Sequence, residues 1–322
     1  MRDSPEKEDG LLRRRGHRRP SVSDSLLNTI KAAETKIERS ILLLWDEIPH
    51  WRRDNAFIRS GYRPIQPSYR ASLRSLFYLH NESVNIWSHL AGALVAVALG
   101  AYLYHVIQPR YESATASDVL VFAAFLGSAV VCLGMSATFH ALMDHSPEVA
   151  AWGNKLDYTG IVALIVGSFV PALYYGLFCR PLLLAAYLYL INVLGLGCVV
   201  VSWVDKFRTA EWRTYRAVMF VCLGVSGVIP VGHGILVDGV QALQDRMSLG
   251  WVVLQGVLYI AGAFLYAVRW PERSFPETFD IWGSSHQIFH VCVLMAAATH
   301  LYGMAKAFDH HHTVMASQCL DL

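Results

Sequence analysis

Two histidines four positions apart, His286 and His290, open the last long apolar stretch of the chain, which stays apolar through Leu301. On an α-helix, residues i and i+4 lie on the same face, about 6 Å apart along the axis. Two imidazoles at that spacing can bind one metal ion. An isolated pair of this kind is a weak signal, so its value depends on what the rest of the chain supplies.

Three further polar residues fall where a metal site needs them. Ser136 and His140 end one apolar stretch, and Asp157 opens the next. Three imidazoles with an open fourth position are typical of catalytic zinc, because a closed structural site normally has four protein ligands. We therefore predict one zinc ion with a water in the open position. The expected ligands are His140, His286 and His290.

The two remaining residues have expected roles beside the metal. The Asp157 carboxylate could accept a proton from the water, and the Ser136 hydroxyl could hold the water or the substrate. A carboxylate at membrane depth is costly unless it is paired or close to a metal, which favours a functional role. The alternative is that Asp157 only bonds a neighbouring backbone group.

The composition indicates the environment of these residues. Hydrophobic residues make up 54% of the 322 residues and charged residues only 16%, against about 25% charged in ordinary globular chains. The composition therefore predicts an integral membrane protein, and nucleic acid is not an expected partner. The first 25 or so residues have no apolar core, so we do not expect a cleavable signal peptide.

Seven stretches are long enough to cross about 30 Å of hydrocarbon. Backbone groups in hydrocarbon must be satisfied internally, which favours an all-α bundle of seven transmembrane helices. Pro171 and Pro230 fall inside the third and fifth stretches, where neighbouring helices can compensate for the lost hydrogen bonds. The predicted spans are 86–107, 118–142, 157–178, 181–202, 215–235, 249–268 and 286–307.

The flanking segments have distinct compositions. Residues 1–23 are polar and Arg-rich, which predicts a disordered basic cytosolic tail. Residues 24–85 are expected to form an amphipathic helix, from Asp24 to about Leu44, and an irregular basic juxtamembrane segment. The transmembrane domain is expected over 86–307, and 308–322 is expected to be a short outer tail.

Loop charge predicts the orientation. Sixteen of the 27 Lys and Arg precede residue 85. With the N-terminus in the cytosol, the inner loops carry seven further Lys and Arg and the outer loops four. We therefore expect a cytosolic N-terminus and an outer C-terminus. This topology brings the five candidate site residues to the same depth, just below the cytoplasmic surface.

Other histidines and the cysteines receive structural interpretations. The sequence Asp309-His310-His311-His312 is expected to belong to a flexible tail, since three consecutive histidines do not share a helix face. Most cysteines lie inside apolar stretches and are expected to pack there; a bridge between Cys179 and Cys319 is conceivable but less favoured. Histidines expected to be packing, interfacial or loop residues are His80, His89, His105, His233 and His300.

The chain resembles the progestin and adiponectin receptor family, also called hemolysin III-related proteins, and within it the adiponectin-receptor-like and fungal zinc-homeostasis branch. The zinc motif of that family is matched by Ser136-x-x-x-His140, Asp157 and His286-x-x-x-His290. Three earlier stretches are also similar to the family, namely Asp46-Glu47-Ile48-Pro49-His50-Trp51, Gly61-Tyr62-Arg63-Pro64 and the opening signature from His80 to His89.

The resemblance implies a seven-helix bundle with a cytosolic N-terminus, zinc on the three histidines, and a cavity holding a ceramide-like lipid or free fatty acid. It implies hydrolysis of the ceramide amide for some members, an external protein or steroid ligand, and roles in lipid and zinc homeostasis. A receptor in which zinc is purely structural and an enzyme like the alkaline ceramidases are the alternatives. Homo-oligomers, and a plasma-membrane or endomembrane location, stay open. A single site at one depth argues against zinc transport.

Overall fold

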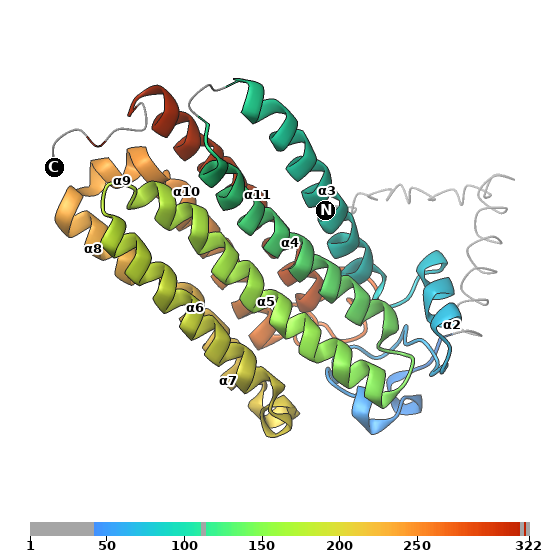
Figure 1. Cartoon of the computed structure of the whole chain (residues 1–322). Coiled ribbons are helices and arrows are strands. Elements are labelled where there is room, and N and C mark those ends of the chain that lie inside the picture. The colour runs from blue at the N-terminus through green and yellow to red at the C-terminus, as the bar shows by residue number, and fades with distance from the viewer. Residues whose placement is uncertain (1–41, 111–113, 316–318, 320–322) are drawn as a thin grey trace, which may run out of the picture. The chain divides into compact units, whose positions relative to one another are not determined.

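The computed structural model describes residues 42–110, 114–315 and Cys319 (Figure 1). The disordered tail predicted for 1–23, and nearly all of the amphipathic helix predicted from Asp24, lie outside these residues. The expected outer tail, 308–322, is described only in part.

Seven helical segments of the described chain are long and apolar enough to cross a membrane. This confirms the prediction of an all-α bundle with seven spans. The spans are α3 (Ser83–Arg110), α4 (Ala116–Leu142), α5 (Pro147–Gly176), α6 (Pro181–Trp203), α7 (Arg213–Val225) followed by α8 (Val228–Asp238), α10 (Leu249–Val268) and α11 (Ser285–Thr313). Two shorter helices are α2 (Tyr69–Arg74) and α9 (Val240–Met247), and 3₁₀ turns occupy Trp45–Glu47, His50–Arg52, Ser75–Phe77, Asp205–Arg208 and Ala210–Trp212.

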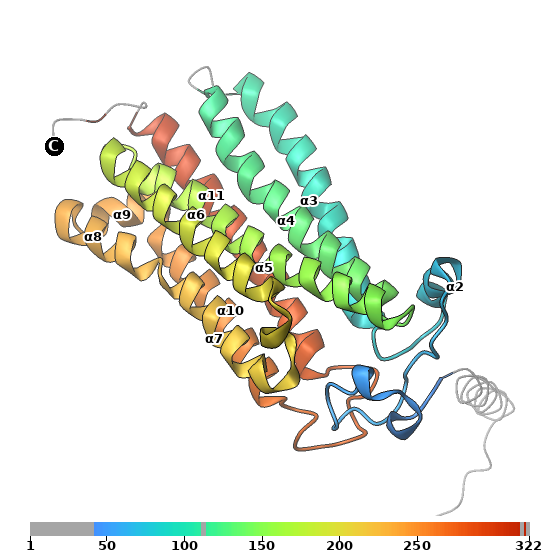
Figure 2. The same ribbon diagram turned by 60° about the horizontal axis from the view of Figure 1, so that its bottom comes forward.

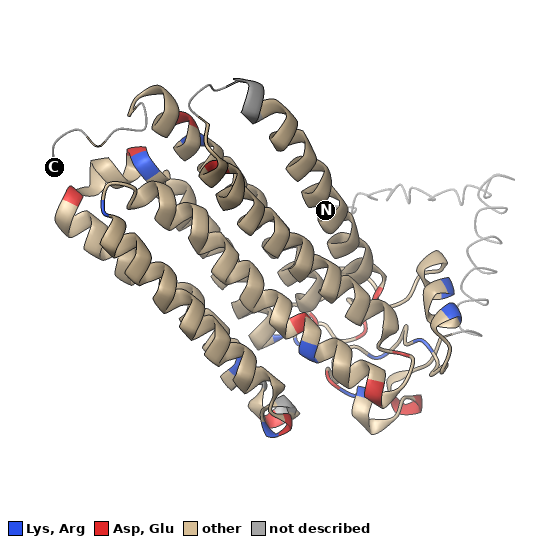
Figure 3. Cartoon of the chain, in the orientation of Figure 1, with Lys and Arg blue, Asp and Glu red and all other residues tan. Residues whose placement is uncertain are grey.

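Charged residues gather toward the two ends of the bundle, while the shafts of the helices are almost free of them (Figure 3). Large apolar side chains instead face outward along the shafts. Leu182 of α6 is 86% exposed and Phe264 of α10 is 63% exposed. Such a surface would be unfavourable in water but suits contact with lipid.

Two of the seven spans differ from the predicted bounds in ways that matter for the site. α5 begins at Pro147, where Ser146 caps its first turn by accepting a hydrogen bond from the Val149 amide. Asp157 therefore lies inside the helix rather than at its start. The fifth span is divided between α7 and α8 at Ser226 and Gly227, because a Ser–Gly pair breaks the helical ladder easily.

Close packing of α4 on α5 sets the position of Asp157. A Cβ atom built on Gly160 of α5 would lie 2.8 Å from the Cα of Cys132 of α4. Only glycine allows this approach of the two backbones. Asp157 and Ser136 lie within one turn of this contact, on their respective helices.

One end of the bundle carries the juxtamembrane segment from Leu42 onward, which lies beside the loop between α10 and α11 (Figure 2). Two buried carboxylates of that loop bind the juxtamembrane segment. Glu272 accepts a hydrogen bond from the side-chain amide of Asn55 at 3.0 Å, and Asp280 accepts one from the Ser60 hydroxyl at 2.6 Å. We call this end the histidine end, because His140, His286 and His290 also lie there.

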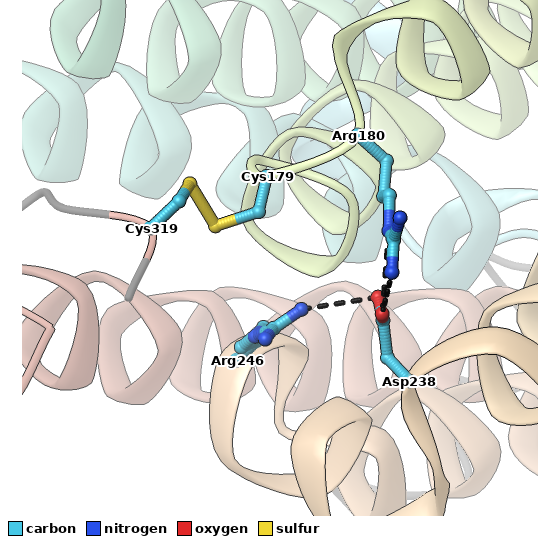
Figure 4. Close-up of a disulfide and its surroundings, with 5 residues drawn as sticks. All are labelled: Cys179, Arg180, Asp238, Arg246 and Cys319. Atoms are coloured by element: carbon cyan, nitrogen blue, oxygen red, sulfur yellow. Dashed lines mark hydrogen bonds and ion pairs between the residues drawn. A yellow bond between two sulfur atoms is a disulfide. The ribbon is translucent and has the colours of Figure 1, made fainter. Parts of the chain in front are cut away.

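At the opposite end a disulfide joins Cys179, just after α5, to Cys319 (Figure 4). Sequence analysis did not favour this bridge, because spacing alone cannot pair two cysteines so far apart in the chain. Beside it, the buried Asp238 carboxylate accepts hydrogen bonds from Arg180 at 2.8 Å and Arg246 at 3.1 Å. These contacts join the start of α6 to the ends of α8 and α9.

The expectation of a flexible tail over Asp309–His312 is wrong. α11 continues to Thr313, and His311 and His312 are buried. The reason is a buried carboxylate: Asp118 of α4 forms an ion pair with His312, N to O 3.2 Å, and accepts a hydrogen bond from the Tyr175 hydroxyl at 2.9 Å. These partners draw the final turns of α11 onto α4 and α5.

Candidate metal centre

His140 sits in the last turn of α4, whose terminal carbonyl groups have no partner within the helix. The buried guanidinium of Arg63 supplies one. It donates to the carbonyl oxygens of His140 at 2.6 Å and Ala141 at 2.9 Å, and its Nη1 lies 3.4 Å from the Asp144 carboxylate. A cation at a helix C-terminus is also electrostatically favourable. Arg63 therefore fixes the backbone that carries His140.

His286 and His290 lie on the first turns of α11, whose start is fixed by two polar side chains. The Glu272 carboxylate accepts hydrogen bonds from the Ser285 amide, at 2.8 Å, and from the Ser285 hydroxyl. Gln287 accepts from the Gly283 amide at 2.6 Å and donates to the Ile281 carbonyl at 2.9 Å. The Ser285 amide is one of the donors that an isolated helix start would leave unsatisfied.

The structure brings the three predicted ligands together. His140, His286 and His290 each offer one ligand atom, and these atoms lie within 4.8 Å of one another. The Nε2 atoms of His286 and His290 are 3.1 Å apart, and the buried Nε2 of His140 has no hydrogen-bond partner among the described residues. Buried nitrogens are normally paired, so this convergence fits a cation held between them.

The chemistry of the donors indicates which metal suits the site. Three imidazoles without a thiolate suit zinc and other borderline metal ions. Two nitrogen ligands of a tetrahedral zinc ion lie roughly 3.3 Å apart, given zinc–nitrogen bonds of about 2.0 to 2.1 Å. The separation of the His286 and His290 nitrogens is close to that value.

Ser136 and Asp157 lie next to the three histidines. Both are buried, and their side chains share a hydrogen bond. A cavity of about 540 Å³ opens beside them, and its wall includes Ser136, Asp157, His286 and His290. Apart from a few polar groups, its lining is apolar and comes mainly from α5, α7, α8, α10 and α11. Its volume lies in the range of pockets that hold small ligands.

Arg216 of α7 adds a cation to the cavity wall. Its side chain is largely buried, donates to the backbone carbonyl of Thr209 at 2.9 Å, and lies 5.3 Å from the ring centroid of Tyr158. Tyr158 and Tyr266 line the same cavity. From the sequence, Arg216 was only one of the seven Lys and Arg residues assigned to the inner loops, because its place in the cavity depends on the fold of α7.

His89 of α3 also belongs to this region. Its ring stacks on that of His290 with centroids 3.5 Å apart and planes within 3° of parallel, and it lines the cavity. From the sequence, His89 was expected to be a packing, interfacial or loop residue. The contact forms between residues far apart in sequence, so no spacing rule could have indicated it.

Glu82 is a further residue of the site to which the sequence assigned no chemical role. It directly precedes α3, and its Oε2 lies 2.7 Å from the Nδ1 of His140. Burial raises the pKa of this carboxyl, but its contact with His140 and the hydrogen bond from Asn85 outweigh burial, so the pKa lies below its ordinary value. Nearby, burial and the positive charge of Arg63 lower the pKa of His80 to about 3.

The fold and the site together define a seven-helix membrane protein with three converging histidines beside an apolar cavity. The family model for haemolysin-III related proteins matches residues 77–301. The chain belongs to this family, and it is an adiponectin-receptor-like, multi-pass integral membrane protein. The match covers the first six spans and the seventh as far as Leu301.

The chain is similar to several proteins whose names describe receptors. It is 46% identical to the "Adiponectin receptor protein" of Drosophila melanogaster over 275 residues, 85% of this chain and 61% of the relative. It is 44% identical to the "ADIPOR-like receptor IZH2" of Saccharomyces cerevisiae over 288 residues, 89% of this chain and 90% of the relative. It is 43% identical to the "Progestin and adipoQ receptor-like protein 1" of Caenorhabditis elegans over 82% of this chain and 60% of the relative. The chain thus spans about three fifths of the two animal relatives and nearly all of the yeast one.

Proposed function

We propose that this protein binds one zinc ion on His140, His286 and His290 and hydrolyses the amide bond of a ceramide-like lipid held in the cavity. The observation that carries the proposal is the convergence of three histidine nitrogens beside an apolar cavity of about 540 Å³ that also contains a carboxylate. An apolar cavity between the helices of the bundle suits an acyl chain, and the polar groups at its histidine end suit an amide.

Zinc bound there supplies a Lewis acid that activates water for attack on a carbonyl. Asp157 would accept the proton that the water loses and return it to the nitrogen of the leaving amine. Its hydrogen bond to Ser136 holds the carboxylate in place. Arg216, a buried cation on the cavity wall, can bind the carboxylate of the fatty acid that hydrolysis releases.

The same proposal includes the orientation, with the N-terminus in the cytosol and the histidine end near the cytoplasmic surface. Loop charge supports it. The disulfide between Cys179 and Cys319 supports it as well, because Cys179 follows the end of α5 that is remote from Asp157 and the histidines. Disulfides persist on the oxidising side of a membrane, which is the side away from the cytosol.

A second candidate function is a ligand receptor in which the metal is structural. The observation that favours it is that the histidines come from only two helices, His140 from α4 and the other two from α11. A metal on these ligands would join α4 to α11, the second and the seventh spans. The names of the relatives also describe receptors.

One experiment separates the two candidates. Wild type, Asp157→Asn and the double variant His286→Ala/His290→Ala are purified in detergent, and bound zinc is measured beside hydrolysis of long-chain ceramide. The hydrolase predicts one zinc per wild-type chain, no zinc in the double variant, and zinc without turnover in Asp157→Asn. Zinc without turnover of any long-chain amide in the wild type would favour the receptor, and a wild type without zinc would refute both.

A further inference from the structure

The turn that opens α3 contacts two of the three candidate metal ligands. Glu82 Oε2 lies 2.7 Å from His140 Nδ1 and accepts a second hydrogen bond from Asn85 Nδ2 at 2.6 Å. The backbone carbonyl oxygen of Asn85 lies 3.2 Å from His290 Nδ1. One short segment thus faces the outer nitrogens of histidines that come from α4 and α11.

These contacts determine which nitrogen of each ring is available to a metal. A carboxylate and a carbonyl oxygen are acceptors, so each neutral ring must carry its proton on Nδ1 to make the bond. The Nε2 atoms of His140 and His290 are then unprotonated and able to bind a metal. These are also the atoms that point toward the shared space, since the Nε2 of His290 lies 3.1 Å from that of His286.

We propose that Glu82 is a positioning residue for the metal site. It orients the His140 ring, holds it in the tautomer that binds metal, and makes Nε2 a stronger ligand by placing a negative charge behind the ring. This inference rests on the proposed zinc function and deepens it by assigning a further residue. Residues that orient metal-binding histidines in this way typically change metal affinity 10- to 100-fold when they are replaced.

The carboxylate group itself, and not the backbone of Glu82, makes this contact. The backbone carbonyl oxygen of Glu82 accepts from the Ile86 amide at 3.0 Å, and its amide donates to His80 Nδ1 at 3.1 Å. Both backbone bonds survive side-chain substitution, so the start of α3 is retained in the variants. The Glu82 side chain is 15% exposed and that of His140 only 3%, which shields their hydrogen bond from water.

Three substitutions test the proposal, each in the full chain in detergent. Glu82→Ala removes the acceptor, Glu82→Gln keeps an acceptor oxygen without the charge, and Glu82→Asp keeps the charge on a shorter side chain. The matched control is Asp280→Asn. Asp280 is a buried carboxylate at the same end that accepts hydrogen bonds from the Arg59 amide and the Ser60 hydroxyl.

The primary measurement is the zinc dissociation constant, obtained by competition with a chromophoric chelator. Ligand-field absorption of the cobalt-substituted protein and the thermal midpoint of the zinc-free protein are recorded beside it. We expect one zinc per chain at saturation in every variant. The dissociation constant should rise 10- to 100-fold in Glu82→Ala, less in Glu82→Gln, and least in Glu82→Asp. The cobalt spectrum should change in Glu82→Ala, and Asp280→Asn should change the midpoint alone.

Wild-type zinc affinity in both Glu82→Ala and Glu82→Gln would overturn the inference while leaving the zinc site intact. An equal loss of affinity in Asp280→Asn would overturn it too, because the effect would then follow general destabilisation. If Glu82→Ala does not fold, the comparison of Glu82→Gln with the wild type decides. A wild-type protein without zinc would refute the proposed function, and this inference with it, so the two failures are distinct.

Discussion

The Nη2 of Arg63 donates a hydrogen bond to the carbonyl oxygen of His140 at 2.6 Å, although the two residues belong to different parts of the fold. The side chain of Arg63 is fully buried, and its partner Asp144 is nearly so. Removing one member of a buried ion pair typically costs about 3 to 5 kcal/mol, because the other charge is left uncompensated. Arg63 thus contributes to stability and to the placement of a candidate metal ligand at once.

We therefore expect Arg63→Met to lower the free energy of unfolding by about 3 to 5 kcal/mol. Arg63→Lys should fall between it and the wild type, since an ammonium cannot reproduce the guanidinium's several directed bonds. Thermal unfolding in detergent measures both. The control is Arg53→Met, because Arg53 bonds the carbonyls of Ile48 and Asp46 in a partly exposed place. Equal midpoints for the two Met variants would contradict the prediction.

The contact between Gly160 and Cys132 gives a second prediction. Gly160→Ala should separate α4 from α5, since a Cβ would lie 2.8 Å from the Cα of Cys132. We expect a lower thermal midpoint and, because Asp157 moves with α5, slower ceramide hydrolysis. The matched control is Gly127→Ala on α4, where an added Cβ meets nothing within 4 Å. That change should be neutral or stabilise by up to about 1 kcal/mol. Equal effects of the two would show that the close approach is not required.

Metal removal should destabilise the bundle. A metal that binds only the folded state stabilises it by about 2.7 kcal/mol when its free concentration is 100 times the dissociation constant. We expect a chelator to lower the thermal midpoint of the wild type and zinc to restore it. His286→Ala/His290→Ala should show neither response, because it lacks two of the three candidate ligands. A chelator response that persists in this variant would place the stabilising metal elsewhere.

Stability should also depend on pH through His80. Its pKa is about 3 in the folded protein and about 6.5 when unfolded. The unfolded state therefore binds the proton more readily, and the contribution of His80, complete above pH 6.5, is lost as the pH falls below that value. Between pH 8 and pH 5 the loss is about 2 kcal/mol.

In the wild type the Nδ1 of His80 accepts a hydrogen bond from the Glu82 amide. His80→Asn removes the titrating ring but keeps a side-chain acceptor for this amide. The thermal midpoints of the wild type and His80→Asn should therefore approach each other as the pH is lowered from 8 to 5. A constant difference between them across this range would show that His80 does not titrate on unfolding.

The orientation can be tested with Cys319, which is exposed and bridged to Cys179. After mild reduction of intact cells, a membrane-impermeant maleimide should label Cys319 from outside if the C-terminus faces away from the cytosol. A Cys319→Ser chain controls for labelling of other cysteines. Labelling only after the membrane is made permeable would reverse the proposed orientation for a chain at the cell surface; for a chain in internal membranes, sealed vesicles of known sidedness give the same comparison.

Much of the architecture was predictable because each membrane span requires a long apolar stretch in the sequence. Apolar runs of sufficient length gave all seven spans, and α10 matches its predicted range, 249–268. The start of α5 was not predictable in this way, since the polar turns between Pro147 and Asp157 extend the helix beyond its apolar part. The burial of His312 depends on Asp118, which is distant in sequence, so the end of α11 was also placed wrongly.

The candidate site shows the same division. Residue type and helical spacing were enough to propose His140, His286 and His290, and the structure brings these side chains together. The residues that hold them were missed. Glu82 and Arg63 act on His140 through contacts between segments that only the folded bundle brings together, and neither has a spacing pattern of its own. Candidate metal ligands can be found from local sequence, but the residues that position them can be identified only in the tertiary structure.

The disulfide has a consequence for how the chain is assembled in the membrane. Four membrane-spanning segments separate Cys179 from Cys319, and an even number returns the chain to the side from which it started. A chain that skipped any one of these insertions would place its two cysteines in different compartments, where they could not meet. A formed disulfide therefore indicates that an even number of segments between the two cysteines was inserted. A free Cys179 thiol would identify molecules in which one of these segments was not inserted.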